Sequence, residues 1–285
     1  MKIDNDVNNR QMHYTAAGIG TGAVAGGAFG YLQKPWIKNG DLSDSFIKQV
    51  SAKNVENDLK HKDTIISELK KLSETGNIDN VSEYTITMLD DAKNKTAEQI
   101  KAQANVALDY MKSETGAKNI DELPQMATER IKENSFAENQ KHIDELKSLK
   151  ITEDISVDEI AKLYDEKVSS WTEKSVENIQ QKITAKGKKF VVDELKQDIA
   201  DEIKSYQENI TEIKDSTKEY IDISGKKMKD LPSDANIFEK DFYNIIKKSI
   251  SETNWKNAGK WAGIGAAALG VIGLGISSLT GKKNS

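Results

Sequence analysis

Glycine is concentrated near the two ends of this 285-residue chain. Fourteen of the eighteen glycines lie in residues 18–40 or 259–281, and the 218 residues between these segments hold only four. An isolated glycine interrupts regular structure, so these four are expected to end helices. The sequence therefore divides into two glycine-rich ends and a long glycine-poor middle.

Charge divides the chain in the same way. Residues 1–40 carry a net charge of +2 and residues 256–285 carry +4, which leaves −11 for residues 41–255 because the whole chain carries −5. A surface that binds nucleic acid needs a basic footprint. The acidic middle therefore argues against a nucleic-acid partner.

Residue types that build catalytic and metal sites are scarce. The chain has no cysteine, which excludes disulfides, thiol catalysis and thiolate metal sites. His13, His61 and His142 are far apart in the sequence, and no pair has the spacing of metal ligands. No set of nucleophile, base and orienting residue is visible. We therefore expect no enzymatic activity, no cofactor and no metal site.

The middle region has the apolar spacing of amphipathic helices. Apolar residues recur every three or four positions in residues 47–72, 157–183 and 192–220, and more weakly in residues 83–116. Helices of about 25–35 residues, roughly 40–50 Å long, would bury such narrow stripes against one or two neighbours. We expect an all-α fold of long amphipathic helices in an elongated bundle or coiled coil, flanked by two glycine-rich apolar helices.

Particular residues mark the ends of these helices. Ser156 and Glu159 have the spacing of a capping box, which predicts a helix that begins at Val157. Glycines that follow an apolar stripe predict helix C-termini. These predicted stops are Gly76, Gly116, Gly187 and Gly225.

The first glycine-rich segment contains a sequence that resembles a dinucleotide-binding loop. Residues 18–23 read Gly-Ile-Gly-Thr-Gly-Ala, which matches the pattern G-x-G-x-x-A. That loop requires a buried strand before it and a βαβ unit around it. The residues before it are polar and no strand pattern follows, so we reject a dinucleotide cofactor.

Two uncharged runs of nineteen residues, 14–32 and 261–279, have the length of membrane spans. At 1.5 Å per residue each is roughly 28 Å long as a helix, close to the thickness of the hydrocarbon core. The first run has few large apolar residues and is expected to insert poorly alone. The predicted organisation is a polar tail at 1–13, a transmembrane segment at 14–33, an acidic helical domain at 41–255, a second transmembrane segment at 261–279 and a basic tail at 280–285.

Glycine spacing predicts how the two runs pack. Four glycines of the first run recur every fourth residue, and three glycines of the second share a helical face. Small residues on one face let two backbones approach closely, as in glycine-zipper membrane helices. We expect the two segments to pair, within one chain or between copies, through Gly18, Gly22, Gly26, Gly30, Gly263, Gly270 and Gly273.

Tryptophans and lysines border the two runs. Trp36, Trp255 and Trp261 lie where interfacial aromatic residues are found, so a lipid bilayer is the expected partner. The neighbouring lysines lie on the side of the middle region, which predicts by the positive-inside rule that the acidic domain is cytoplasmic. These lysines are Lys34, Lys38, Lys256 and Lys260.

Three other interpretations of the ends remain open. Residues 23–25 form an Ala-Val-Ala site at which a signal peptide could be cleaved, although Asp4 and Asp6 spoil its positive region. The glycine-rich helices could also lie in the core of a soluble bundle. In the third interpretation only the C-terminal run anchors the chain.

The predicted function is that of a membrane-anchored helical structural protein, such as a scaffold, tether or spacer, without catalytic activity. One alternative is a membrane-active oligomer that forms a pore or translocation conduit, similar in layout to a phage injection protein or a helical toxin. A further alternative is a soluble helical bundle that binds a protein partner. Besides lipid, the expected partner is a second copy of the chain or an unidentified protein.

Overall fold

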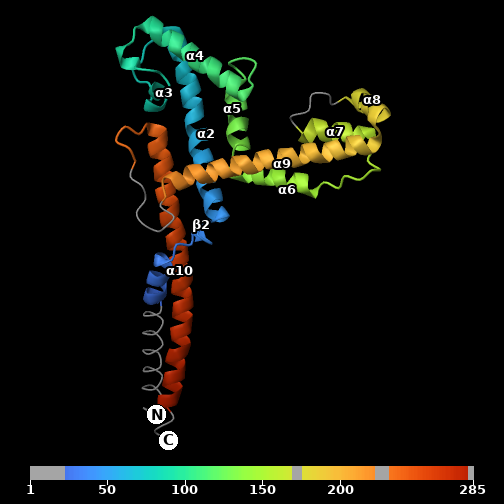
Figure 1. Ribbon diagram of the computed structural model, residues 1–285. Coiled ribbons are helices and arrows are strands. Elements are labelled where there is room, and N and C mark those ends of the chain that lie inside the picture. The colour runs from blue at the N-terminus through green and yellow to red at the C-terminus, as the bar shows by residue number, and fades with distance from the viewer. Residues whose placement is uncertain (1–22, 169–174, 222–230, 282–285) are drawn as a thin grey trace, which may run out of the picture. The chain divides into compact units, whose positions relative to one another are not determined.

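The structure is a computed structural model that describes residues 23–168, 175–221 and 231–281, with only the backbone at 265 and from 268 on. These residues are mostly helical and contain very little strand, which confirms the predicted all-α class (Figure 1). The chain folds into two compact units. The first contains Met1–Val50, Tyr220–Asp230 and Asp241–Ser285, and the second contains Ser51–Glu219 and Leu231–Lys240.

The first unit begins, within the described residues, with a helix over residues 23–32. A short antiparallel hairpin follows, made of β1 (Ile37–Lys38) and β2 (Asp41–Leu42). Asn39 and Gly40 between them have φ of 55° and 81°, and two left-handed residues in succession are what a tight hairpin turn requires. The remaining helical parts are the start of α2 (Asp44–Thr75) and most of α10 (Ile237–Gly281).

A small apolar core joins these elements of the first unit. The rings of Trp36 and Phe46 lie 5.9 Å apart, and both side chains are buried. Gln49 on α2 bonds to α10 twice: its amide donates to Glu252 at 3.3 Å, and its oxygen accepts from Thr253 at 3.3 Å. The start of α2 is therefore held on α10 by polar as well as apolar contacts. Other buried members of the first unit are Leu42, Ile47, Val50 and Ile246.

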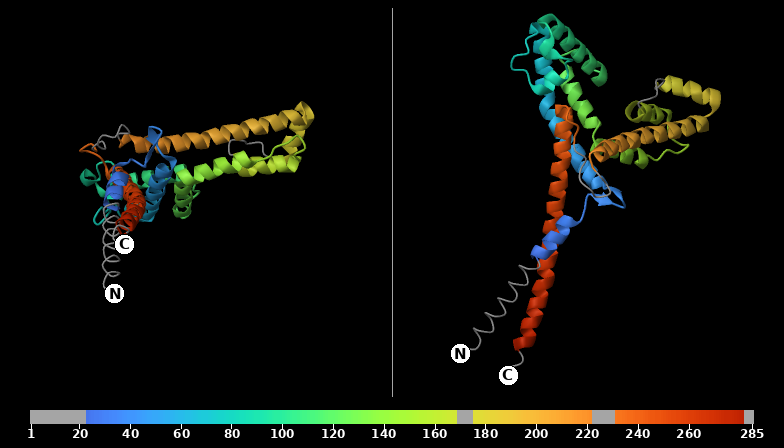
Figure 2. Two further views of the ribbon diagram at one scale, coloured as in Figure 1. Left: turned by 90° about the horizontal axis from the view of Figure 1, so that it is seen from below. Right: turned by 60° about the vertical axis from the view of Figure 1, so that its left-hand side comes forward.

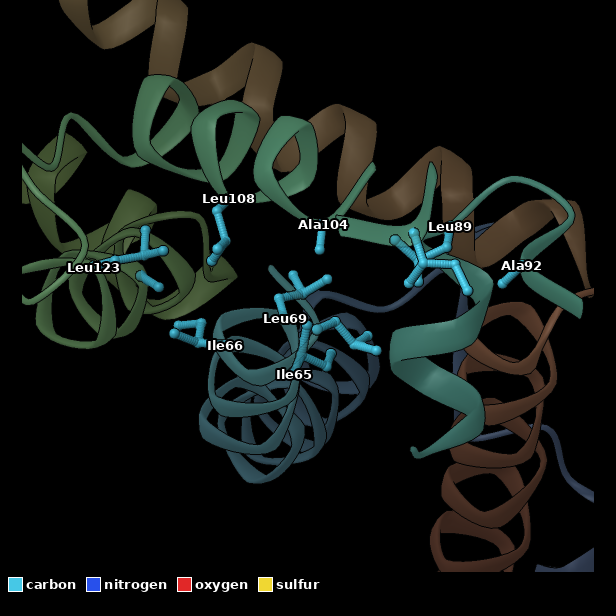
Figure 3. Close-up of a cluster of buried hydrophobic side chains, with 11 residues drawn as sticks. Ile65, Ile66, Leu69, Leu89, Ala92, Ala104, Leu108 and Leu123 are labelled. Atoms are coloured by element: carbon cyan, nitrogen blue, oxygen red, sulfur yellow. The ribbon is translucent and has the colours of Figure 1, made fainter. Parts of the chain in front are cut away.

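The second unit has two apolar cores. One lies where the C-terminal half of α2 meets α4 (Ala97–Thr115) and α5 (Leu123–Glu133), with the short α3 (Glu83–Thr87) and the 3₁₀ turn η1 (Ala92–Asn94) beside them (Figure 3). In the close-up the side chains point from these elements into a shared interior. The fully buried members include Leu69, Leu72, Ala104, Leu108 and Leu123.

The other core of the second unit forms around α9 (Lys188–Glu219). This helix packs along α6 (Phe136–Ser148) and against α7 (Val157–Lys167) and α8 (Val176–Lys186), as Figure 1 shows. Tyr164 is fully buried here, and its hydroxyl donates to Asp198 at 2.9 Å. The predicted stripe from residue 192 supplies the buried face of α9 through Val192, Leu195 and Ile199.

Several predicted helix ends are confirmed. Ser156 Oγ accepts from the Glu159 amide at 3.2 Å, and the Glu159 carboxylate accepts from the Ser156 amide at 2.9 Å, so the capping box at the start of α7 is complete. The predicted stops Gly76, Gly116 and Gly187 directly follow α2, α4 and α8. Gly225 lies outside the described residues. The long helices α2 and α9 have 32 residues each, within the expected length.

Two expected long helices are in fact broken, which corrects the prediction. Residues 83–116 form α3, η1 and α4, because Asp91 is left-handed with φ of 44° and Thr96 restarts the helix with a capping box to Gln99. Residues 157–183 form α7 and α8, and Ser175 caps the second by accepting from the Asn178 amide at 3.2 Å. A capping side chain accepts hydrogen bonds from the unpaired amides at a helix start and so stabilises a new helix there. Where the apolar stripe is weak, burial does little to oppose such a break.

No helix in the described part of the chain is long and apolar enough to cross a membrane. The predicted membrane-embedded helices therefore gain no support from the structure. The backbone of the predicted second segment, residues 261–279, is helical as part of α10.

Candidate functional site

The described ends of the two glycine-rich segments meet within the first unit. The helix of residues 23–32 lies along α10 in both figures of the whole chain (Figure 1 and Figure 2). Gly30 lies beside Asn257 and Gly26 lies beside Trp261, so the two helices are antiparallel. The side-chain amide of Asn257 donates to the Gly30 carbonyl at 2.7 Å and to Gln33 Oε1 at 3.5 Å. We call this contact the helical hairpin.

Two glycines allow the close approach of these helices. A Cβ atom on Gly30 would lie 2.7 Å from the Asn257 carbonyl oxygen and 2.8 Å from Trp261 Cβ, which is closer than real side chains come. A Cβ atom on Gly26 would collide with the carbonyl group of Trp261. At Gly27 it would lie 3.5 Å from Ala262 Cβ, an ordinary van der Waals contact. The backbones therefore pack at a distance that only glycine permits at residues 26 and 30.

The other predicted packing glycines lie elsewhere. No described atom lies within 4 Å of a Cβ atom placed on Gly263, so this residue takes no part in the described contact between residues 23–32 and α10. Gly18 and Gly22 fall outside the described residues. Gly270 and Gly273 lie where only the backbone of α10 is described, so their predicted packing remains a prediction.

The face that α10 uses in the hairpin was not predicted from the sequence. The contact is made by Asn257, Ala258, Trp261 and Ala262, one side of the helix over little more than one turn. Ala258 and Ala262 are small residues four positions apart, the same spacing as the glycines of the first run. This spacing is the sequence feature that could have predicted the contact face of α10.

Aromatic side chains flank the hairpin contact. The rings of Phe29 and Trp261 meet edge to face with centroids 5.1 Å apart, and those of Tyr31 and Trp255 lie 5.0 Å apart. Trp255 is 65% exposed. The third predicted interface tryptophan, Trp36, is only 6% exposed and belongs to the core of the first unit. Two of the three tryptophans therefore lie at the hairpin, and one of them faces solvent.

Large exposed apolar side chains gather on the helical hairpin. Exposed apolar residues that gather on one part of a fold make that part a candidate interaction site. The hairpin is therefore a candidate binding surface. The exposed residues are Val24, Phe29, Tyr31 and Leu32 on the first helix and Trp255 and Ile264 on α10.

The second unit contains a cavity of about 310 Å³. Apolar side chains line most of it, and Asp58, Glu114 and Arg130 lie among its polar members. Two further polar side chains of the lining have structural roles: Lys62 donates to the Pro124 carbonyl at 3.1 Å, and His61 stacks beside the ring of Tyr84. No group of acids and histidines in the described residues could hold a metal ion. The apolar lining includes Ile65, Met88, Tyr110, Met111 and Phe238.

A polar network beside the first core of the second unit lowers the pKa of one carboxyl group, that of Glu68. Glu68 on α2 accepts from the Ser82 amide at 3.1 Å and from the hydroxyls of Ser82 and Thr85, each at 2.6 Å. Burial alone would raise the pKa of Glu68, but these hydrogen bonds outweigh burial and lower it below its usual 4.5. The carboxylate thus ties α3 to α2, and we assign it a structural role.

Comparison with known proteins finds no match to this chain among protein-family models, curated proteins or solved structures. The fold defines an all-α helical protein. Its function must be inferred from its own residues.

Proposed function

We propose that the protein is a helical scaffold anchored at a membrane by the hairpin that its two glycine-rich ends form. The observation that carries this proposal is the close packing of Gly26 and Gly30 against α10 at Trp261 and Asn257. In an antiparallel contact, the chain before Gly26 and the chain after Trp261 leave in the same direction. We propose that the uncharged runs 14–32 and 261–279 continue side by side from there.

Physical reasoning favours a bilayer as the environment of this hairpin. Helices in lipid associate through close packing of small residues and interhelical hydrogen bonds, because lipid offers no hydrophobic drive for association. The contact contains both features, the glycines at 26 and 30 and the Asn257–Gly30 hydrogen bond. The first run, which is weak alone, would gain a partner helix for insertion. We propose further that the acidic middle lies on the cytoplasmic side.

A scaffold, tether or spacer role suits the rest of the chain. The second unit is built on most of α2 and on α9, helices of 32 residues each, and each buries one narrow stripe. The polar groups whose pKa shifts in this unit, such as Glu68 and Tyr164, hydrogen-bond to other parts of the core. We therefore propose no catalytic activity.

One observation favours a second candidate, an oligomer that forms a pore or conduit. Gly259 and Gly263 are four residues apart on α10 and have open space around them among the described residues. A second copy could pack there in the way that residues 23–32 pack on the opposite side. A defined ring in detergent together with dye leakage from loaded vesicles would favour the pore, and a monomer or dimer without leakage would favour the scaffold.

Fractionation of the full chain tests the proposed function. We expect the protein to stay in the membrane pellet after washing with carbonate and with high salt, because apolar insertion resists both treatments. Gly26→Leu with Gly30→Leu should loosen the hairpin, whereas Gly259→Leu with Gly263→Leu adds the same apolar bulk outside the contact. Recovery of the unmodified chain in the soluble fraction would overturn the membrane proposal.

A further inference from the structure

We propose that the exposed aromatic residues and lysines of the hairpin bind the headgroups of anionic phospholipids. This surface, the hairpin collar, consists of Tyr31, Lys34, Trp255, Lys256 and Lys260. The inference rests on the proposed function, because it names the lipid class that the anchored hairpin prefers.

The aromatic pair of the collar has the character of a membrane-interface site. The Tyr31 and Trp255 rings lie 5.0 Å apart, and they are 40% and 65% exposed. Rings with an apolar body and a polar edge favour the headgroup level of a bilayer over both water and hydrocarbon. Phe29, which is 53% exposed, precedes Tyr31 on the side of the uncharged run and offers apolar surface for the acyl region.

The lysines of the collar lie close to one structural contact. Lys34 follows Gln33 in the sequence and Lys256 precedes Asn257, and the side chains of Gln33 and Asn257 are 3.5 Å apart. Lys260 follows one helical turn after Lys256. The two helices therefore bring Lys34 and Lys256, which are remote in sequence, to the same end of the contact.

Within the described part of the chain, no ion pair neutralises the positive charge of the collar. Residues 7–40 and 253–285 contain no aspartate or glutamate. Lys34, Lys256 and Lys260 are exposed, and none of them forms an ion pair with another described residue.

Several lysines of the second unit, by contrast, pair with a neighbouring carboxylate. Lys112 pairs with Asp109 at 2.6 Å, and Lys167 pairs with Glu145 at 2.8 Å. The collar combines lysines that form no ion pair with flanking segments that contain no acid, so charge complementarity favours an anionic ligand there. The exposed rings beside the lysines favour a lipid surface over a soluble anion.

The test measures binding of the full chain to two kinds of vesicle. One kind contains phosphatidylcholine only, and the other contains phosphatidylcholine with phosphatidylglycerol. Three lysines near an anionic surface should strengthen binding by at least about tenfold at low salt, and added salt should weaken this preference by screening. We expect K34Q/K256Q/K260Q to lose the preference and to keep its binding to phosphatidylcholine.

A matched variant controls for net charge. K93Q/K132Q/K189Q removes three exposed lysines from the second unit and should keep the preference for phosphatidylglycerol. If both triple variants lost the preference for phosphatidylglycerol equally, the proposed binding site at the collar would be overturned, because the preference would then depend only on net charge. Equal binding of the unmodified chain to both kinds of vesicle would overturn the collar alone, whereas failure to bind either kind would also overturn the proposed membrane anchor.

Tryptophan emission gives a second readout. Transfer of the exposed Trp255 ring into the interface should shift its emission to shorter wavelength when phosphatidylglycerol vesicles are added. The shift should be smaller in Trp255→Phe, which keeps the ring contact with Tyr31. An identical shift in this variant would mean that Trp255 does not enter the interface and would contradict the proposed aromatic part of the collar.

Discussion

The side-chain amide of Asn257 donates a hydrogen bond to the backbone carbonyl of Gly30 at 2.7 Å. Gly30 lies in the last turn of its helix, where carbonyl groups have no partner within the helix. Asn257 therefore satisfies a helix end that lies 227 residues away in the sequence. This bond fixes the position of the first helix along α10, and the first prediction concerns its removal.

Asn257→Ala should lower the free energy of unfolding of the first unit by about 1–3 kcal/mol, because it leaves a partly buried carbonyl without a donor. Urea denaturation of the full chain measures this loss. Asn105→Ala is the control, since the exposed Asn105 amide bonds only to Lys101 within its own helix. Equal losses of unfolding free energy for the two substitutions would mean that the Asn257–Gly30 hydrogen bond between the helices adds no stability.

Alanine should have opposite effects at Gly30 and at the pair Gly259 and Gly263. Gly30→Ala should destabilise the hairpin by about 1–3 kcal/mol, because the added methyl group meets the backbone of Asn257 and the side chain of Trp261. Gly259→Ala and Gly263→Ala should each stabilise α10 by about 0.5–1 kcal/mol, since they raise helix propensity where space is open. Thermal unfolding distinguishes the signs, and a stabilising Gly30→Ala would refute the close contact.

The ionised Glu68 should make the second unit more stable at neutral pH than in acid. A carboxyl group whose pKa is lowered on folding contributes stability above its unfolded pKa, and this stability is lost as the pH falls through the folded pKa. The advantage of the unmodified chain over Glu68→Gln should therefore hold above pH 4.5 and disappear below it.

Urea titrations from pH 3 to pH 7 check this dependence. Glu74→Gln, a change of an exposed residue on the same helix, serves as the control. A difference between Glu68→Gln and the unmodified chain that does not change with pH would contradict the assigned hydrogen-bond network.

Val106 and Leu108, two positions apart on α4, should differ in their contribution to stability. Leu108 is fully buried in the core of the second unit, whereas Val106 is 69% exposed. Leu108→Ala should cost about 2–5 kcal/mol, and Val106→Ala should change stability by less than about 0.5 kcal/mol. Comparable losses in urea denaturation would show that the two faces of α4 are assigned wrongly.

Features set by a few adjacent residues could be predicted from the sequence. The Ser156–Glu159 capping box and the stop at Gly116 depend on local hydrogen bonds and on the backbone freedom of glycine, so tertiary packing changes them little. The Asn39-Gly40 turn is equally local, but its strands of two residues each are too short to give a strand pattern in the sequence.

Features that depend on a distant partner could not be predicted in the same way. The glycine pattern indicated that residues near Gly26 and Gly30 could approach another helix closely, but it did not identify the face of α10. That face is selected by the Asn257 hydrogen bond and the Phe29–Trp261 ring contact, which exist only after the ends of the chain meet. The break in the helix expected over residues 83–116 was also not predictable from periodicity. The left-handed Asp91 and the Thr96 cap interrupt an apolar stripe that is too weak to keep the helix continuous.

An engineered disulfide between Gly27→Cys and Ala262→Cys, made in the full chain within membranes, tests the membrane-anchored hairpin most directly. A Cβ atom on Gly27 would lie 3.5 Å from Ala262 Cβ, within the range that a disulfide spans, and the natural chain has no cysteine to compete. The control pair is Gly27→Cys with Gly263→Cys. Nothing described lies within 4 Å of a Cβ atom on Gly263, so these two sulfurs should not meet. We predict rapid intramolecular disulfide formation for the first pair only, in protein that stays in the carbonate-washed membrane pellet. Equal disulfide yields for both pairs, or disulfide formation confined to protein in the soluble fraction, would contradict a membrane-anchored hairpin.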